Sequence, residues 1–352
     1  MAIVNKLQSM ADVNKPARPI LFVVGNSRSG TTMLGRMLGM HVDVHTFGEL
    51  HFFEQLVAAD AMIKSAALSA GEQELLLAKL FTRERRGLFS PVNNGAFLDE
   101  IEQVMANCDG ADAVSVYLAF LRYETEKNGG SIPCEQTPRY IFLVEAILNA
   151  IPNARVINLV RDPRDVLLSQ KNKWRRRFLG AHNIPLKEAL RAWANYHPYL
   201  ISRLWRSAVE KSEAMASDER FLTIRFESLL ENAQETLIKV CHFGCIEFQP
   251  AMLQVPQSGS STGRDDPNRL GVDAKRLHAW RKGGLSAREI STCQRVAGDV
   301  MVRQGYELTD ASSSLWMRVL DATSLLMKGG LAFLLNLNRS KNLVASLRSR
   351  FG

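Results

Sequence analysis

Cysteine, long apolar runs and metal-ligand clusters are scarce in this sequence, and each absence excludes a class of protein. Only five of the 352 residues are Cys, none in a C-x-x-C pair, which predicts a reducing, cytoplasmic location rather than a disulfide framework. No group of residues has metal-binding spacing, so we expect no metal. No run of about 18 uncharged apolar residues occurs, which excludes a clean membrane span. Residues 1–18 contain no apolar segment of signal-peptide length.

The bulk composition is that of a folded globular protein. Hydrophobic residues make up 46% of the chain and charged residues 23%, which excludes a disordered chain and allows one large domain with insertions. The formal net charge of +8 favours an anionic partner. Charge alone does not choose among a small anion, nucleic acid and an anionic membrane surface.

One stretch near the N-terminus has the pattern of a strand, a glycine-bounded loop and a helix. Residues 20–24 form a continuous apolar run rich in β-branched residues, which predicts a strand buried on both faces. Gly25 ends this run, and after Gly30 the apolar residues adopt helical spacing, at Met33, Leu34, Met37 and Leu38. In this context the backbone N–H groups of a loop, backed by a helix N-terminus, bind phosphate.

The loop matches the P-loop pattern G-x-x-x-x-G-K-[ST] except at one place. Gly25, Gly30 and Thr32 have the required spacing, but Thr31 occupies the Lys position. The missing Lys argues against ordinary ATP or GTP hydrolysis, and the loop cation is instead Arg28. A tight turn that binds nothing and a degenerate P-loop phosphotransferase or NTPase are the alternatives.

The segment Gly25–Leu34 resembles the 5′-phosphosulfate loop of the sulfotransferases, which use 3′-phosphoadenosine 5′-phosphosulfate (PAPS) as donor. The second half of their signature, a strand followed by Arg and a Ser eight residues later, is matched by residues 155–160, Arg161 and Ser169. The resemblance covers residues 19–307. It implies a PAPS site formed by both motifs, through Ser27, Arg28, Ser29, Gly30, Thr31, Thr32, Arg161 and Ser169.

The resemblance also implies the fold and the domain organisation. We expect an α/β protein with the P-loop-like sulfotransferase fold, in which helices flank a central, mostly parallel sheet. Residues 19–307 would form the sulfotransferase domain, with a helical insertion at 52–130 that shapes the acceptor site. Residues 312–352 would form a separate basic, amphipathic tail.

The implied reaction is in-line transfer of a sulfuryl group from PAPS to an acceptor hydroxyl or amine, without a metal. In tyrosylprotein sulfotransferases and their bacterial relatives, an acid in a G-E segment is the catalytic base, which makes Glu49 the base candidate. His51 is the competing base because its ordinary pKa suits the task. Arg28 would stabilise the charge that develops on the leaving oxygen. A solvated Glu49 that caps the next helix is the alternative.

Two positions depart from the family pattern. Gln136 stands where relatives have the Lys of an E-K-T-P segment, and it can donate a hydrogen bond but carries no charge. Phe226 replaces the Tyr of the third family segment, R-Y-E-x-L, so a hydroxyl contact to the 3′-phosphate would be absent.

Further cations occur in two segments. Residues 171–177 contain five cations and Trp174, and this run is either a lining of the 3′-phosphate approach, a contact for an acidic acceptor, or an exposed helix end. Relatives close a basic loop over the nucleotide ahead of a Trp. In that segment Lys275 and Arg276, before Trp280, are the candidate PAPS contacts.

The acceptor, the oligomeric state and the role of the tail are not determined by the sequence. We expect a small-molecule, lipid or glycan acceptor and no nucleic-acid partner. Residues 312–352 hold six cations against Asp321 alone, so the tail either contacts a membrane surface peripherally or docks on the domain. A non-catalytic, nucleotide-binding protein recruited to membranes is a further alternative.

Overall fold

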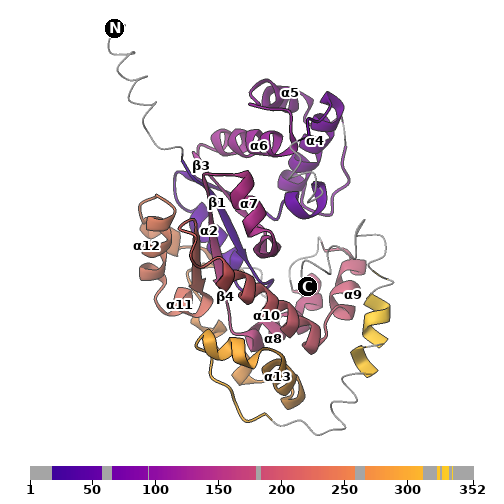
Figure 1. The fold of residues 1–352 in the computed structure, drawn as a ribbon, viewed down its shortest axis with the longest axis vertical. Helices are drawn as coiled ribbons and strands as arrows, with labels where there is room; N and C mark the ends of the chain where they lie inside the picture. The colour runs from indigo at the N-terminus through magenta and orange to yellow at the C-terminus, as the bar shows by residue number, and fades with distance from the viewer. Residues whose placement is uncertain are drawn as a thin grey trace.

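Five parallel strands form the sheet that carries the phosphate loop (Figure 1). The computed structural model describes residues 18–57, 66–93, 95–179, 184–257, 266–311, 323–325, 327–332 and 335. The strand order is β2-β3-β1-β4-β5, and all four pairings are parallel. The strands are β1 (Ile20–Gly25), β2 (Val44–Phe47), β3 (Ile132–Gln136), β4 (Ala154–Val160) and β5 (Phe221–Arg225).

The order of the strands places a topological switch between β1 and β4. The chain leaves β1 for β2 and β3 on one side, then crosses to β4 and β5 on the other. In open parallel sheets ligands bind at the carboxyl ends of the strands at such a switch. The loop after β1 and Arg161 after β4 therefore lie at the same edge.

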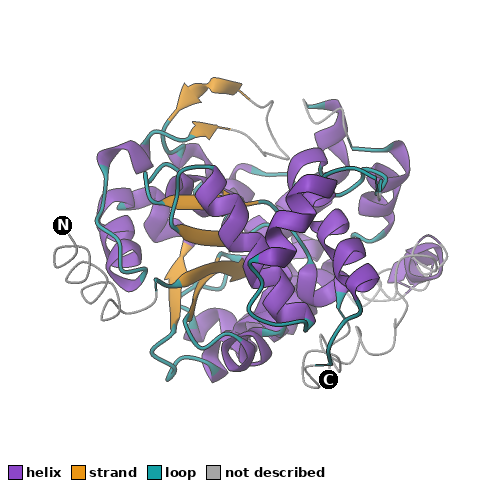
Figure 2. Ribbon diagram, turned by 90° about the horizontal axis from the view of Figure 1, so that it is seen from above, coloured by secondary structure: helices purple, strands orange, loops and turns teal. Residues whose placement is uncertain are grey.

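Helices cover both faces of the sheet, as Figure 2 shows from above. Phe22 and Val24 of β1 belong to one apolar core, and Leu21 and Val23 belong to the other, because successive side chains of a strand point to opposite faces. The predicted α/β fold with a central parallel sheet is confirmed. The flanking helices are α2 (Thr31–Gly39), α7 (Val144–Ala150), α8 (Pro163–Lys171), α9 (Leu186–Ala194), α10 (Pro198–Ala214), α11 (Phe226–Glu231), α12 (Ala233–Phe243) and α13 (Ala287–Arg303).

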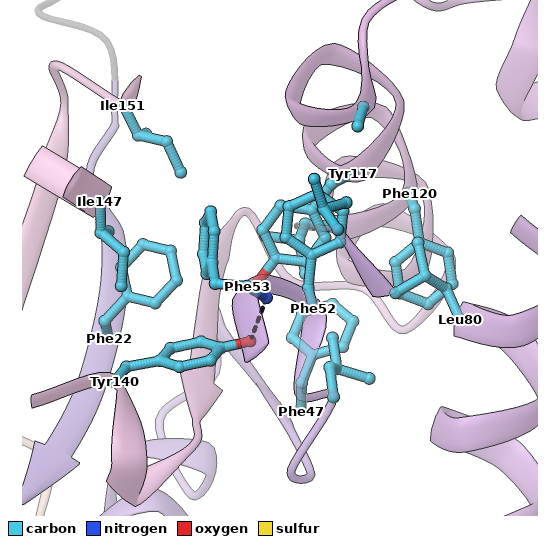
Figure 3. Packing of buried hydrophobic residues seen from close by; sticks show 14 of the residues in the cluster. Phe22, Phe47, Phe52, Phe53, Leu80, Tyr117, Phe120, Tyr140, Ile147 and Ile151 are labelled. Carbon is cyan, nitrogen blue, oxygen red and sulfur yellow. Dashed lines mark hydrogen bonds between the residues drawn. The ribbon is translucent and has the colours of Figure 1, made fainter. Parts of the chain in front are cut away.

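The segment between β2 and β3 is helical where the structure describes it. Its elements are η1 (Phe52–Leu56), α4 (Ala70–Arg86), α5 (Leu98–Ala106) and α6 (Ala113–Lys127). The Phe52 ring stacks on Tyr117 of α6 at a centroid distance of 4.0 Å, and Phe53 meets Tyr140 edge-on at 5.1 Å (Figure 3). The insertion therefore shares one apolar core with the sheet. Its role in shaping the acceptor site stays a prediction.

Short elements complete the domain after β3 and after α12. They are η2 (Pro138–Phe142), η3 (Lys173–Phe178), η4 (Pro250–Leu253), β6 (Pro256–Gln257), β7 (Asp266–Leu270), η5 (Ala274–Arg276) and η6 (Ala279–Lys282). Strands β6 and β7 pair antiparallel outside the main sheet.

Most of the predicted tail, 312–352, lies outside the described residues. The part that is described, 323–325, 327–332 and 335, lies beside α9 in Figure 1. Lys328 Nζ donates to the Tyr196 carbonyl at 3.3 Å, and Arg191 Nε donates to the Leu335 carbonyl at 2.7 Å. These contacts favour docking on the domain. Among the described helices, none combines the length and the apolar character that a bilayer crossing requires.

Gly25→Ala should destabilise the protein by about 3 kcal/mol or more, because Gly25 has a φ of +148° and an added Cβ would lie 2.5 Å from the Leu159 carbonyl oxygen. The measurement is the free energy of unfolding in urea. Gly129→Ala is the control: Gly129 has a φ of +76° with open space around it, so only the backbone strain of about 1 kcal/mol should appear. Equal losses in the two variants would contradict the importance of the β1–β4 contact.

Candidate active site

The loop between β1 and α2 is curled by three residues with positive φ: Gly25 (148°), Arg28 (77°) and Gly30 (101°). Helix α2 then begins without a side-chain N-cap and without an acidic residue in its first turn. The Ser29 hydroxyl oxygen is buried without a hydrogen-bond partner in the described structure. A curled loop, an uncapped helix N-terminus and an unsatisfied hydroxyl are features that suit the binding of an anion.

The threonines after the loop have different surroundings. Thr31 is buried, and its hydroxyl accepts a hydrogen bond from Gln136 Nε2 at 3.2 Å. Thr32 is exposed, and Ser27 is half-buried. Gln136 is therefore directed at the loop, where it braces Thr31 and adds no charge.

The structure brings the two sequence motifs together. Arg28 Nε donates to Ser169 Oγ at 2.8 Å. Arg161 Nη1 donates to the Arg28 carbonyl at 3.3 Å, and its Nη2 donates to the Arg276 carbonyl at 3.2 Å. The side chain of Lys275, by contrast, is exposed. Of the two candidates from that segment, only Arg276 reaches the site.

Phe226 lies between the loop and Arg161. The Arg161 guanidinium sits over the Phe226 ring, 4.4 Å from its centroid, in a cation–π contact. A Cβ added at Gly30 would overlap the same ring. The Phe226 ring thus orients Arg161 and fixes the loop backbone. Neither contact requires the hydroxyl of the Tyr that relatives have at this position.

Buried hydrogen bonds hold the second motif to the segment that carries Arg276, and two ion pairs lie within the motif itself. The Trp280 backbone N–H donates to Asp165 Oδ1 at 2.9 Å, and its indole N–H donates to Asp162 Oδ2 at 3.2 Å. Asp165 faces Arg161 at 3.7 Å, while Asp162 pairs with Arg164 at 2.8 Å. Because these groups are buried, each needs its partner, and the network fixes Arg161 in place.

Glu49 forms a chain of three titratable groups with His51 and Glu54. His51 Nε2 lies 3.1 Å from a Glu49 carboxylate oxygen, and His51 Nδ1 lies 2.9 Å from Glu54 Oε2. Burial by itself lowers the pKa of His51, but its hydrogen bonds to the two carboxylates outweigh burial and raise it. Burial raises the pKa of Glu49, and its bond to His51 with the charges of Lys173 and Arg139 lowers it overall.

The two carboxylates on either side of His51 favour its protonated form. His51 is buried, whereas the Glu49 side chain is 45% exposed, so of the two groups Glu49 is the one open to solvent. A protonated His51 donates both of its N–H groups and has no lone pair left to accept a proton.

Helix α4 braces the turn that carries these groups. Arg83 donates to the Leu50 carbonyl and, at 3.1 Å, to Gln55 Oε1. Glu84 Oε2 accepts the Gly48 amide at 3.3 Å. From the other side, the Phe53 amide donates to the Tyr140 hydroxyl at 3.4 Å (Figure 3). The insertion therefore determines where Glu49 points.

Several cations surround Arg28, with little compensating acid. Burial and the charges of Arg176, Arg161 and Arg276 lower the pKa of Arg28 to about 9, although Glu49 opposes this effect. Sequence reasoning included Arg176 only as one of five cations in a run and attached no role to Arg139. No sequence motif marks Arg139 and Arg176, because they come near Arg28 only through the packing of η2 and η3 against the loop.

Comparison with known families agrees with this geometry. Residues 19–250 match the model of a family described as the sulfotransferase family. The chain belongs to the sulfotransferase family. The expected resemblance is thereby confirmed, and the protein is a sulfotransferase. A search of curated proteins found no match.

Solved sulfotransferase structures have the same fold. The sulfotransferase domain of the olefin synthase from Synechococcus PCC 7002 is 22% identical, with a TM-score of 0.51, over 84% of this chain and 98% of that domain. The sulfotransferase domain from the curacin biosynthetic pathway is also 22% identical, with a TM-score of 0.49, over 84% of this chain and all of that domain (100%). At this identity the first likeness shows the fold alone.

No three His, Cys, Asp or Glu side chains of the described ranges are grouped so that they could hold a metal ion. The acids nearest the loop are engaged by His51, as Glu49 is, or by Arg161 and Trp280, as Asp165 is.

His51 should titrate above its ordinary pKa of 6.5, and His45 below it, because burial lowers the pKa of His45 while the two carboxylates raise that of His51. The measurement is a nitrogen-15 NMR titration of both imidazoles. Since the folded-state pKa of His51 is raised, its ion pairs stabilise the fold fully below pH 6.5, and this contribution disappears as the pH rises through the folded-state pKa. In Glu49→Gln the His51 pKa should fall. A His51 that titrates below His45 would contradict the assignment.

Proposed function

We propose that this sulfotransferase uses PAPS as donor and transfers its sulfuryl group in line to an acceptor hydroxyl or amine. The observation that carries the proposal is the meeting of Arg28, Arg161, Ser169 and Arg276 at the carboxyl ends of β1 and β4. The two phosphate motifs come from segments more than a hundred residues apart, and a donor with two separate phosphates explains why they meet.

The donor is held at its two ends. Backbone N–H groups of the loop and of the α2 N-terminus, at Gly30, Thr31 and Thr32, bind the 5′-phosphate. Arg161 and Ser169 bind the 3′-phosphate, and Arg276 closes over it. This arrangement fixes the donor's direction and places the sulfuryl group in front of Arg28.

The acceptor side is built around Glu49. As the acceptor oxygen attacks sulfur, its proton moves to the Glu49 carboxylate, and the bond between sulfur and the bridging oxygen breaks. The electron pair of that bond stays on the phosphate oxygen of the leaving nucleotide, where Arg28 stabilises the charge. His51 and Glu54 orient Glu49, so the proposal places Glu49 as the base and His51 as the residue that positions it.

Glycans, lipids and small alcohols all offer the hydroxyl that this site requires. The acceptor in the proposal is therefore defined by its reacting group. The exposed side of Glu49, next to the turn that α4 braces, is where that group would enter.

The product nucleotide, 3′-phosphoadenosine 5′-phosphate (PAP), should bind in the absence of metal. Its affinity should be at least about tenfold higher than that of its 2′-phosphate isomer or of ATP, because the proposed charged hydrogen bonds from Arg161 require a phosphate at the 3′ position. Isothermal titration calorimetry with EDTA present measures this. A preference for Mg-ATP would instead support the degenerate P-loop phosphotransferase.

Arg276→Ala should weaken PAP binding by about tenfold, because it removes a cation near Arg28. The backbone carbonyl that accepts the hydrogen bond from Arg161 is kept in this variant, so the loss reports on the side chain. Lys275→Ala, the control in the neighbouring position, should change the affinity by less than about twofold because an exposed cation is screened by water. Equal effects of the two substitutions would contradict the placement of Arg276 at the donor.

A further inference from the structure

We propose that Glu227, Trp205 and Tyr306 are positioning residues that set the direction of Arg161 and thereby control recognition of the donor's 3′-phosphate. The inference rests on the proposed PAPS-dependent function and deepens it. The three side chains come from α11, from α10 and from the segment after α13, and all of them are buried. None belongs to the two phosphate motifs. Glu227 is the acid of the third family segment, R-Y-E-x-L, for which the proposed donor contacts give no role.

The connection between β4 and α8 consists of two residues, Arg161 and Asp162, and the peptide group that joins them is held at both ends. Its carbonyl, from Arg161, accepts a hydrogen bond from Trp205 Nε1 at 2.8 Å. Its N–H, from Asp162, donates to Glu227 Oε1 at 2.9 Å. Because a peptide group is planar, these two bonds at opposite ends restrict its rotation. The direction in which the Arg161 side chain leaves the backbone is restricted with it. We call Trp205 and Glu227 the peptide clamp.

The residue before Glu227 contacts the other end of Arg161. The Phe226 ring lies against the Arg161 guanidinium, 4.4 Å from ring centroid to guanidinium carbon. A Cβ added at Gly30 of the phosphate loop would overlap the same ring. The start of α11 therefore fixes the backbone of Arg161, its guanidinium and the phosphate loop relative to one another.

Tyr306 holds the two members of the peptide clamp together. Its hydroxyl donates to Glu227 Oε2 at 3.0 Å, and its ring meets the Trp205 indole edge-on at a centroid distance of 6.3 Å. Burial and the charge of Glu227 raise the pKa of Tyr306 well above its usual value, so the hydroxyl keeps its proton and donates. From another side the Arg225 guanidinium lies over the Tyr306 ring, 4.6 Å from its centroid. One carboxylate oxygen of Glu227 thus serves Tyr306 and the other serves Asp162.

Recognition of a phosphate depends on such positioning. A guanidinium presents its donors in a rigid fork, which matches a phosphate only over a narrow range of directions. Two nitrogens of the Arg161 fork donate to the carbonyls of Arg28 and Arg276. Its Nε is buried without a partner in the part of the chain that the structure describes. The peptide clamp therefore acts on the 3′-phosphate through Arg161, without a contact of its own to the donor.

The test compares PAP with adenosine 5′-phosphate (AMP), which lacks only the 3′-phosphate. In Glu227→Met the Asp162 amide loses its acceptor, so the PAP affinity should fall by about tenfold while the AMP affinity changes less than about twofold. Glu227→Gln should restore the PAP affinity to within about threefold of the original, because its amide oxygen still accepts the Asp162 N–H. All affinities are measured by isothermal titration calorimetry on the full chain at pH 7.

Glu289→Met is the matched control. Glu289 is buried like Glu227, at 6% against 4% exposed, and it also accepts a tyrosine hydroxyl and a backbone N–H. The donors are Tyr196, at 2.6 Å, and Ser286, at 2.8 Å. These bonds hold the N-terminus of α13, and neither of them involves the peptide after Arg161. The control variant should lose stability and keep the ratio of PAP to AMP affinity.

A double-mutant cycle shows whether Glu227 acts through Arg161. Arg161→Met alone should remove most of the preference for PAP over AMP. In that background Glu227→Met should lower the PAP affinity by less than about twofold further, because the side chain to be positioned is gone. Losses that simply add would mean that Glu227 acts on the donor by another route.

A milder variant tests the clamp if Glu227→Met does not fold. Tyr306→Phe keeps the ring against Trp205 and removes the hydroxyl that holds Glu227, so the PAP affinity should fall by about threefold and the AMP affinity should stay unchanged. Tyr196→Phe, which removes the buried hydroxyl bound to Glu289, should change neither affinity.

The outcomes that overturn the inference differ from those that overturn the proposed function. Equal losses of PAP and AMP affinity in Glu227→Met and Tyr306→Phe would give these residues a general structural role. An unchanged preference for PAP in both variants would remove the clamp from 3′-phosphate recognition. If the unmodified protein binds PAP no better than AMP, the proposed donor itself is wrong.

Discussion

The close pairing of β1 and β4 is the constraint on which the site depends. Gly25 lies opposite Leu159 with no room for a Cβ, so the two strands end side by side. Their parallel direction carries the loop after β1 and Arg161 after β4 to one edge of the sheet. The hydrogen bonds from Arg161 to Arg28 and from Arg28 to Ser169 follow from that juxtaposition. Without it, the two anion-binding motifs would be separate surface features.

Charge is distributed unevenly across this edge. On one side the acids have partners: Asp162 binds Arg164 and Trp280, and Asp165 faces Arg161. On the other side Arg28 and its neighbouring cations have few acids near them. The first arrangement fixes side chains in place, and the second leaves like charges close together, which favours an anionic ligand. The same residue type, arginine, thus has two surroundings at this edge: in one it is paired with an acid, and in the other it lies among further cations.

The position of Glu49, the proposed base, is set by a separate structural unit. Glu49 follows the edge strand β2, and its orientation depends on His51, on Glu54 and on the α4 side chains Arg83 and Glu84. The helical insertion is therefore linked to the turn that carries Glu49 through hydrogen bonds, and to the sheet through the shared apolar core (Figure 3).

The sequence by itself determined the parallel α/β fold, the family and the two phosphate motifs, because these depend on local patterns: an apolar strand, a glycine-bounded loop and an Arg–Ser spacing. Only the tertiary structure decided how single side chains meet. It joined Arg276 to the site and left Lys275 exposed, and it placed His51 between two carboxylates. Such outcomes depend on packing between segments distant in sequence, and neither spacing nor composition encodes that packing.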